Sequence, residues 1–159
     1  MLNFLSTVAA SAVGFVIAKF ATAWFDAHVS KASYLEAERN QDSEIVRETI
    51  ADISLKAMDY WSRDHQPTDQ IEEAKITAGI RRVAILIDEL FEHDRALHGA
   101  CSIELDRFED KVTVGDFGSA KRKAESQRTQ DILLAAETVS SKVKQSRRKL
   151  KPKWFGNGA

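Results

Sequence analysis

The only thiol in this sequence lies close to a histidine, the pairing that a cysteine nucleophile needs. Cys101 is the single cysteine, and His98 precedes it by three residues, so a helix would place both side chains on one side. Nucleophilic catalysis also requires a shaped pocket and donors for the developing oxyanion, and no motif supplies these. We therefore interpret Cys101 as a buried or incidental thiol and predict no catalytic residue.

Carboxylates and histidines also recur at helical spacing, as they do in metal sites. Glu89 and His93 are four residues apart, and His98 and Glu104 follow along the chain. Helical bundles that hold two irons use Glu-x-x-His on two helices together with further Glu side chains, and this motif does not occur once. The pattern is typical of a solvated acidic helix face, so the sequence predicts neither a metal site nor a cofactor.

Short enzyme motifs give no stronger signal. Asp116-Phe117-Gly118 matches the magnesium-binding tripeptide of kinases, but the Gly-rich loop, the strand lysine and the catalytic loop are all missing. No Walker loop, GxSxG or HExxH sequence occurs either. We therefore predict that the protein is not an enzyme.

Basic side chains are concentrated near the C-terminus. Residues 1–118 contain 12 Lys and Arg against 21 Asp and Glu, whereas residues 119–159 contain 11 against three. Seven basic residues with no acidic residue among them, which we call the basic tail, are Lys142, Lys144, Arg147, Arg148, Lys149, Lys151 and Lys153. Trp154 and Phe155 follow directly and are candidates for a membrane interface.

Three interpretations of the basic tail remain open. Anionic lipid attracts basic side chains near its surface by about 1 kcal/mol each, and aromatic side chains favour the interface. Nucleic-acid phosphates would attract the same composition. In the third interpretation, the basic helix stays solvated or neutralises the acidic part of this chain or of a neighbouring subunit. A membrane anchor would hold the tail near lipid, which favours lipid over nucleic acid.

The chain opens on an apolar segment that is long enough to cross a membrane. Residues 1–18 contain no charged side chain, and residues 2–25 contain only Lys19. At a rise of about 1.5 Å per residue, a helix of this length exceeds a hydrocarbon core of about 30 Å. Lys19 can extend its ammonium group to the headgroups, and Trp24 and Phe25 lie where an aromatic belt forms.

We therefore predict a transmembrane helix over residues 1–25. Two alternatives weigh less. A cleaved signal peptide would explain Ala21-Thr22-Ala23, which resembles a cleavage site, but no basic side chain precedes the apolar core. The other alternative is a buried or interfacial helix.

Small residues recur at every fourth position of the predicted span. They are Ser6, Ala10, Gly14, Ala18 and Thr22. Such a stripe lets a second helix backbone approach closely and predicts self-association within the membrane. Chance recurrence in an Ala-rich segment is the alternative.

The orientation of the span follows from its flanking charges. Lys19 and Lys31 flank its C-terminal end, and the α-amino group is the one positive group before it. The positive-inside rule then predicts a single-pass protein of the cell membrane whose body lies in the cytoplasm. A lone cysteine fits that reducing compartment.

Scarce helix breakers predict an all-α fold, in which an N-terminal transmembrane helix precedes a small antiparallel bundle of long helices. The chain has seven Gly and two Pro residues, and Pro67 is the one breaker between Gly14 and Gly79. We divide it into the span (1–25), a juxtamembrane stalk (26–42), a helical bundle (43–150) and a flexible basic and aromatic tail (151–159).

Apolar periodicity predicts three helical segments within the bundle. The first is expected from Ser43 to about Arg63, and the second begins after Thr68 as N-cap and ends or kinks at Gly99. The last is expected from about Ser119, capped by Asp116 or Ser119, to Leu150. The dense apolar run at residues 83–87 predicts burial on more than one side, at the bundle centre or in a subunit interface.

These features favour a membrane-anchored, non-enzymatic assembly or scaffold protein. It would associate with further copies of itself through its span and body, and with a protein partner that the sequence does not identify. A membrane-perturbing effector, of a toxin or anti-phage system for example, is the main alternative. A membrane-tethered nucleic-acid binder is the third hypothesis.

Overall fold

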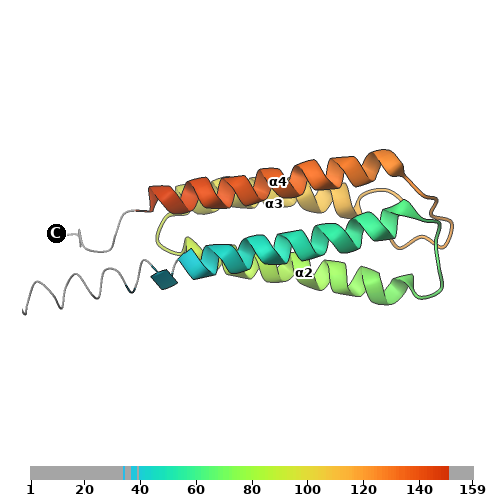
Figure 1. Cartoon of the computed structure of the whole chain (residues 1–159), viewed down its shortest axis with the longest axis horizontal. Coiled ribbons are helices and arrows are strands. Elements are labelled where there is room, and N and C mark those ends of the chain that lie inside the picture. The colour runs from blue at the N-terminus through green and yellow to red at the C-terminus, as the bar shows by residue number, and fades with distance from the viewer. Residues whose placement is uncertain (1–33, 35–36, 39, 151–159) are drawn as a thin grey trace, which may run out of the picture. The chain divides into compact units, whose positions relative to one another are not determined.

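In the computed structural model of this chain, residues 34, 37–38 and 40–150 are described. They form four helices and no strand (Figure 1). The first helix runs through residues 40–62, and α2 (Asp69–Leu90), α3 (Arg95–Thr113) and α4 (Ser126–Lys149) follow. Successive helices run in opposite directions. The predicted all-α fold and helical bundle are therefore confirmed.

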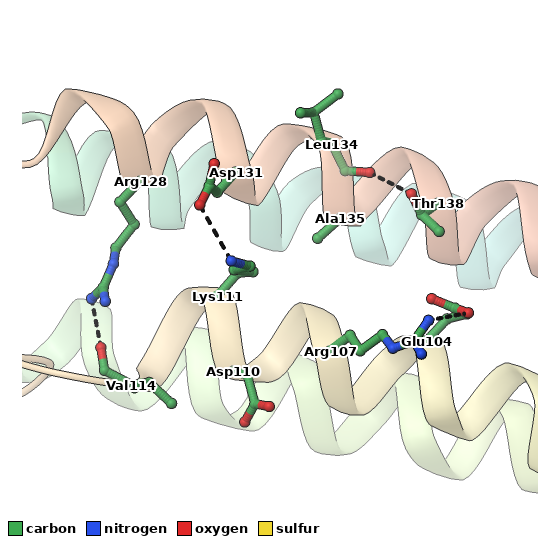
Figure 2. Close-up of a pocket in the computed structure, with 10 residues that line it drawn as sticks. All are labelled: Glu104, Arg107, Asp110, Lys111, Val114, Arg128, Asp131, Leu134, Ala135 and Thr138. Atoms are coloured by element: carbon green, nitrogen blue, oxygen red, sulfur yellow. Dashed lines mark hydrogen bonds and ion pairs between the residues drawn. The ribbon is translucent and has the colours of Figure 1, made fainter.

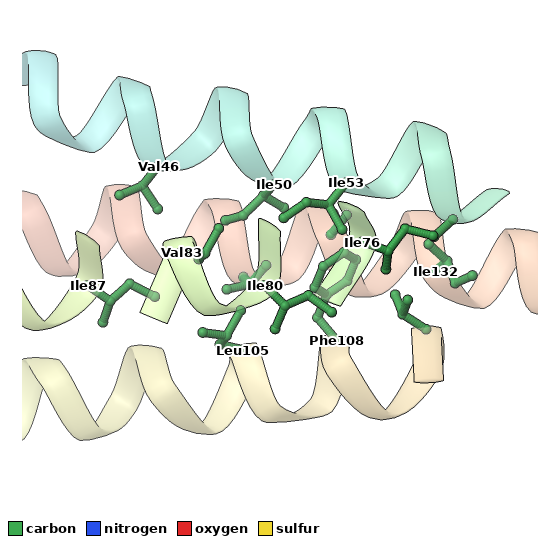
Figure 3. Packing of buried hydrophobic residues seen from close by; sticks show 14 of the residues in the cluster. Val46, Ile50, Ile53, Ile76, Ile80, Val83, Ile87, Leu105, Phe108 and Ile132 are labelled. Atoms are coloured by element: carbon green, nitrogen blue, oxygen red, sulfur yellow. The ribbon is translucent and has the colours of Figure 1, made fainter. Parts of the chain in front are cut away.

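Each helix contributes one seam of buried side chains at alternating spacings of four and three residues. The seams are Val46, Ile50, Ile53 and Ala57; Ile76, Ile80, Val83 and Ile87; Cys101, Leu105, Phe108 and Val112; and Ile132, Ala136, Val139 and Val143. Figure 3 shows many of these side chains meeting between the helices. A mean spacing of 3.5 residues is the repeat of coiled-coil packing, which antiparallel bundles also use.

The break between α2 and α3 corrects the prediction that Gly99 ends or kinks the second helix. The chain turns at residues 91–94, and Gly99 lies inside α3. Asp94 is the N-cap of α3, because its carboxylate accepts a hydrogen bond from the Leu97 backbone N–H at 3.0 Å. Phe91 is buried at the turn. An Asp cap and a buried aromatic residue thus make this turn without glycine or proline.

The start of α4 corrects a second prediction. We expected a helix from about Ser119, but α4 begins at Ser126, and residues 114–125 form the loop that we call the α3–α4 loop. Neither Asp116 nor Ser119 caps α4. The Ser119 side chain instead accepts a hydrogen bond from the Lys121 backbone N–H within a turn.

The start of α2 agrees with the prediction in position but not in its cap. Thr68 occupies the N-cap position of α2, as expected, but its side chain makes no capping hydrogen bond. The carboxylate of the next residue, Asp69, accepts the backbone N–H of Gln66 at 2.9 Å instead.

The predicted transmembrane helix (residues 1–25) and the last residues of the basic tail lie outside the described residues. Within residues 34, 37–38 and 40–150, no helix combines the length and the hydropathy that a membrane span requires.

Two helical glycines provide a matched test of how closely the helices pack. A Cβ atom on Gly79 of α2 would lie 2.7 Å from Cγ1 of Ile53 on the first helix, whereas one on Gly99 would meet no atom within 4 Å. Alanine favours a helix over glycine by about 1 kcal/mol. We expect Gly99→Ala to raise the free energy of unfolding by about that amount. Gly79→Ala should lose this gain to the clash, and urea titrations that rank Gly79→Ala above Gly99→Ala would contradict this packing.

Candidate functional site

A buried arginine from the α3–α4 loop organises the densest group of polar side chains in the described part of the chain. The Arg122 side chain is fully buried, and its guanidinium carbon lies 3.7 Å from the centre of the Tyr60 ring. It donates hydrogen bonds to the backbone oxygens of Tyr60 and Arg63 and to the carboxylate of Asp69. We call these four residues, with Trp61, the Arg122 network.

Asp69 is the anion of this network and is also fully buried. Its oxygens accept hydrogen bonds from Arg122, from Arg63 at 2.7 Å and from the Gln66 backbone N–H. Burial acts to raise the pKa of Asp69, but these hydrogen bonds and the two guanidinium charges outweigh it and hold the pKa below its ordinary value. Asp69 is therefore a carboxylate at neutral pH.

Two aromatic residues at the end of the first helix complete the network. The Tyr60 hydroxyl donates to Glu73 of α2 at 2.7 Å and accepts the Gly118 backbone N–H at 3.0 Å. Burial, partly opposed by the Gly118 hydrogen bond, raises its pKa. The Trp61 indole N–H donates to the Val112 carbonyl at 2.8 Å. These contacts connect the first helix to α2, to α3 and to the α3–α4 loop.

The geometry of the Arg122 network indicates a structural role. A general acid or base must lie within hydrogen-bond reach of a substrate, and the side chains of Arg122 and Asp69 have no solvent-exposed surface. Two backbone hydrogen bonds also fasten the loop beside them, from His65 N–H to the Arg122 oxygen at 3.1 Å and from Glu125 N–H to the Trp61 oxygen at 2.8 Å. The network therefore fixes the path of the α3–α4 loop across one end of the bundle.

Sequence reasoning missed this network. A carboxylate such as Asp69 in the first turn of a helix is what the helix dipole favours on its own, and the helix expected from about Ser119 to Leu150 contains Arg122 between Lys121 and Lys123. All three basic residues look alike in the sequence, yet Lys121 and Lys123 are exposed while Arg122 is buried. The one available signal was the chemistry of arginine, whose planar guanidinium suits buried ion pairs better than a lysine ammonium group.

The structure separates Cys101 from His98. Cys101 is buried in the core, which raises the pKa of its thiol. The His98 side chain is directed toward α2, because its Nε2 atom is hydrogen-bonded to the carboxylate of Asp88. The two side chains do not form a nucleophile and base pair.

The residues of the considered metal site are also not brought together. His98 is bonded to Asp88, and Glu104 forms an ion pair with Arg107 at 2.9 Å. Within residues 34, 37–38 and 40–150, no group of three His, Cys, Asp or Glu side chains is arranged to hold a metal ion.

The tripeptide Asp116-Phe117-Gly118 belongs to the turn of the α3–α4 loop. Phe117 packs against the Tyr60 ring with centroids 5.2 Å apart, and Gly118 donates its backbone N–H to the Tyr60 hydroxyl. Gly118 adopts a positive φ of 76°, which favours glycine. The backbone conformation of this turn therefore explains why residue 118 is a glycine.

The described part of the basic tail does not form one continuous face. Lys144, Arg148 and Lys149 are exposed and Lys142 is half-buried, but Arg147 is buried with 5% exposure. All five lie on or near the last turns of α4, where the helix dipole favours positive charge. Lys151, Lys153, Trp154 and Phe155 lie outside the described residues, as do the candidate span residues.

Two open grooves cross the outer surface of the bundle. One, of about 710 Å³, lies between α3 and α4 (Figure 2). Its charged side chains are already paired in part, since Lys111 bonds Asp131 at 3.3 Å and Arg107 bonds Glu104. The other, of about 860 Å³, follows α2 past Ala74, Ala78 and Ile85 to Phe117. Neither groove is lined by a residue of the Arg122 network.

Comparison of this chain with protein-family models, with curated proteins and with solved structures gave no match in any of the three cases.

Proposed function

We propose that this chain is a membrane-anchored, non-enzymatic assembly protein. Residues 1–25 form its single transmembrane helix, and the helical bundle carries the surfaces that bind further copies or another protein. The membrane anchor is supported by the sequence alone, through an uncharged segment over residues 1–18 with Lys19, Trp24 and Phe25 at its end.

The assembly role is supported mainly by where the polar and the bulky apolar side chains of the bundle lie. The polar groups that converge, those of the Arg122 network, are enclosed. Bulky apolar side chains nevertheless remain outside on all four described helices: Leu55 of the first helix is 67% exposed, Ile85 of α2 is 56% exposed, Ile103 of α3 is 53% exposed and Leu134 of α4 is 62% exposed. We propose that these side chains are contact points of the bundle, since contiguous exposed apolar patches mark surfaces that bind other proteins.

Self-association of the span is tested by two neighbouring alanines that differ in position on the helix. Ala10 belongs to the stripe of small residues and Ala9 does not. Ala10→Leu should separate the two backbones, whereas Ala9→Leu adds the same hydrophobicity on another face. We measure the yield of crosslinked oligomer from the full-length protein in membranes. This yield should fall about tenfold for Ala10→Leu and change little for Ala9→Leu.

Three outcomes would contradict the proposal. Equal yields of crosslinked oligomer from the two variants would contradict self-association through the stripe of small residues. A mature protein that begins near Trp24, or a full-length protein that stays soluble without detergent, would contradict the proposed transmembrane helix. Depolarisation of cells on expression would favour the membrane-perturbing alternative instead.

The basic tail is tested with vesicles, using the bundle and tail without the span (residues 40–159). Lys144→Gln, Arg148→Gln and Lys149→Gln together remove three exposed charges and leave the buried Arg147 in place. At about 1 kcal/mol each, their loss should weaken binding to anionic vesicles roughly a hundredfold. Glutamine at Lys75, Lys111 and Lys121 removes the same charge from other exposed positions and should have little effect.

The lipid interpretation requires that binding falls as salt rises, because exposed charges are screened over about 8 Å at physiological ionic strength. Equal binding to neutral and anionic vesicles would exclude it. Salt-dependent retention of nucleic acid without vesicle binding would favour the nucleic-acid alternative.

A further inference from the structure

The first half of α4 is joined to the rest of the bundle by polar contacts. Arg128 donates a hydrogen bond to the Val114 carbonyl, and its guanidinium carbon lies 3.9 Å from the centre of the Trp61 ring (Figure 2). One turn later, Asp131 forms an ion pair with Lys111 of α3 at 3.3 Å. These contacts add to the hydrogen bonds that already fix the α3–α4 loop, so the start of α4 is held firmly.

The buried side of α4 becomes smaller and more polar toward its C-terminal end. Ile132 is buried near the start, Val139 and Val143 follow, and the last two buried residues are Ser146 and Arg147. Apolar area removed from water is the main favourable contribution to helix packing. The last turns of α4 therefore gain less from burial than the turn at Ile132.

The same end of α4 carries a dense run of positive charge. Residues 142–149 contain five Lys and Arg residues and no acidic residue. Lys144 and Arg148 are four residues apart, so they are neighbours on the helix surface and repel each other. The helix dipole favours cations at this end, but its effect falls off within the last turn. Repulsion therefore works against the helical form of the turn before it.

These turns of α4 cover the thiol of Cys101 on α3. Burial raises the pKa of this thiol, and a hydrogen bond with Ser146 and the charge of Lys142 partly oppose the shift. Cys101 itself has no exposed surface. If the end of α4 moved away, the thiol would lose this cover and become accessible to solvent.

The neighbouring ends of α2 and α3 are held together by contacts of their own. Phe91 is buried in the turn between these two helices, and the Asp94 carboxylate caps α3. Nε2 of His98 on α3 lies 2.5 Å from the Asp88 carboxylate of α2. The two helices therefore remain joined at the end of the bundle where the packing of α4 is weakest.

We infer that the C-terminal half of α4, from Val139 to Lys149, opens from the bundle as a unit while the rest of the bundle stays folded. Segments that few apolar contacts hold in place open locally in this way. The Arg122 network and the contacts of Arg128 keep the start of α4 fixed. Opening brings Arg147 to the surface beside the exposed charges of the basic tail. It thus changes the positive charge that the bundle presents, and it does not depend on the proposed membrane anchor.

The single native thiol reports this opening directly. The rate at which a thiol reagent labels Cys101, divided by the rate in the unfolded chain, gives the population of the open form. The matched control is Val112→Cys in a chain that also carries Cys101→Ser, because it places one thiol at the other end of the same buried seam of α3. In the full-length protein in detergent, we expect Cys101 to be labelled at least about tenfold faster than the thiol of this control.

Two substitutions on α4 separate local opening from unfolding of the whole bundle. Val143→Ala removes apolar contact from the opening segment and should speed the labelling of Cys101 about tenfold. Ile132→Val weakens the fixed part of α4 instead. It should speed labelling in the Val112→Cys control about fivefold and change the labelling of Cys101 less than about twofold.

Hydrogen exchange resolved by peptide identifies the segment that moves. Amides of residues 139–149 should exchange with the same free energy of opening as the labelling of Cys101, whereas amides of residues 130–135 should exchange only when the bundle unfolds. Equal protection of Cys101 and of the thiol in the Val112→Cys control would overturn the local opening. Faster exchange of residues 99–105 than of residues 139–149 would overturn the role of α4, because the thiol would then be exposed by movement of α3.

Discussion

Replacing Arg122 with methionine is expected to lower the free energy of unfolding by about 3–5 kcal/mol, because it removes one partner of a fully buried ion pair. The carboxylate of Asp69 and the backbone oxygens of Tyr60 and Arg63 would each lose a donor. Methionine fills a similar volume, so the loss reports the hydrogen bonds and the charge rather than a cavity. Urea unfolding of residues 40–159, followed by circular dichroism, measures it.

Lys123→Met is the matched control for this change. Lys123 is the next residue in the chain and forms an ion pair with Asp64 at 2.9 Å, but both side chains are largely exposed. Exposed pairs contribute about 0–1 kcal/mol, so this variant should unfold close to the unmodified protein. Equal unfolding midpoints for Arg122→Met and Lys123→Met would show that Arg122 does not fix the α3–α4 loop.

Asp69→Asn should have an effect of similar size at neutral pH and a characteristic pH dependence. The substitution keeps the shape but removes the charge that three donors address, so we expect a loss of about 3–5 kcal/mol at pH 7. The folded-state pKa of Asp69 lies below its ordinary value. Its contribution is therefore present above the ordinary carboxyl pKa of about 3.9 and is lost as the pH falls through the lower folded-state pKa.

The difference between the unmodified protein and Asp69→Asn should consequently be largest near neutral pH and should narrow on acidification below about pH 4. Urea titrations at a series of pH values measure this difference. Asp64→Asn is the control, since its carboxylate also accepts a loop hydrogen bond, from the Ala124 backbone N–H at 3.0 Å, but lies at the surface. A difference for Asp69→Asn that does not depend on pH would mean that the carboxylate is not the stabilising group.

Both predictions concern the position of the α3–α4 loop, and they bear on the proposed assembly role through the rigidity of the bundle. The Arg122 network connects the start of α2 to the loop that leaves α3. Loss of the network should therefore lower the free energy of unfolding first and association only as a consequence.

Part of the candidate surfaces could be predicted from the sequence. The dense run at residues 83–87 indicated a bundle centre or a subunit interface, and its split into buried and exposed sides follows from helical geometry. The position of the turn between α2 and α3 could not be predicted, because the Asp94 cap and the buried Phe91 make it without glycine or proline. We expected the break at Gly99, whereas α2 already ends at Leu90.

The sequence by itself determined the fold class and the inward face of every helix. Apolar residues repeat at alternating spacings of four and three along each segment. This spacing places them on one face of a helix, and that face is buried against the core. The first helix ends near Arg63, as predicted, since residues near Pro67 disfavour continued helix.

Only the tertiary structure decided the break at residues 91–94, the start of α4 and the burial of Arg122 and Arg147. Residues 120 and 124 fit a helical pattern, yet the α3–α4 loop is held out of a helix by hydrogen bonds to His65 and Trp61, about 60 positions earlier. A buried guanidinium is stable there because Tyr60 and Asp69 supply its partners. Contacts between positions so far apart leave no periodic signal along the chain, which is why Arg122 looked like its exposed neighbours.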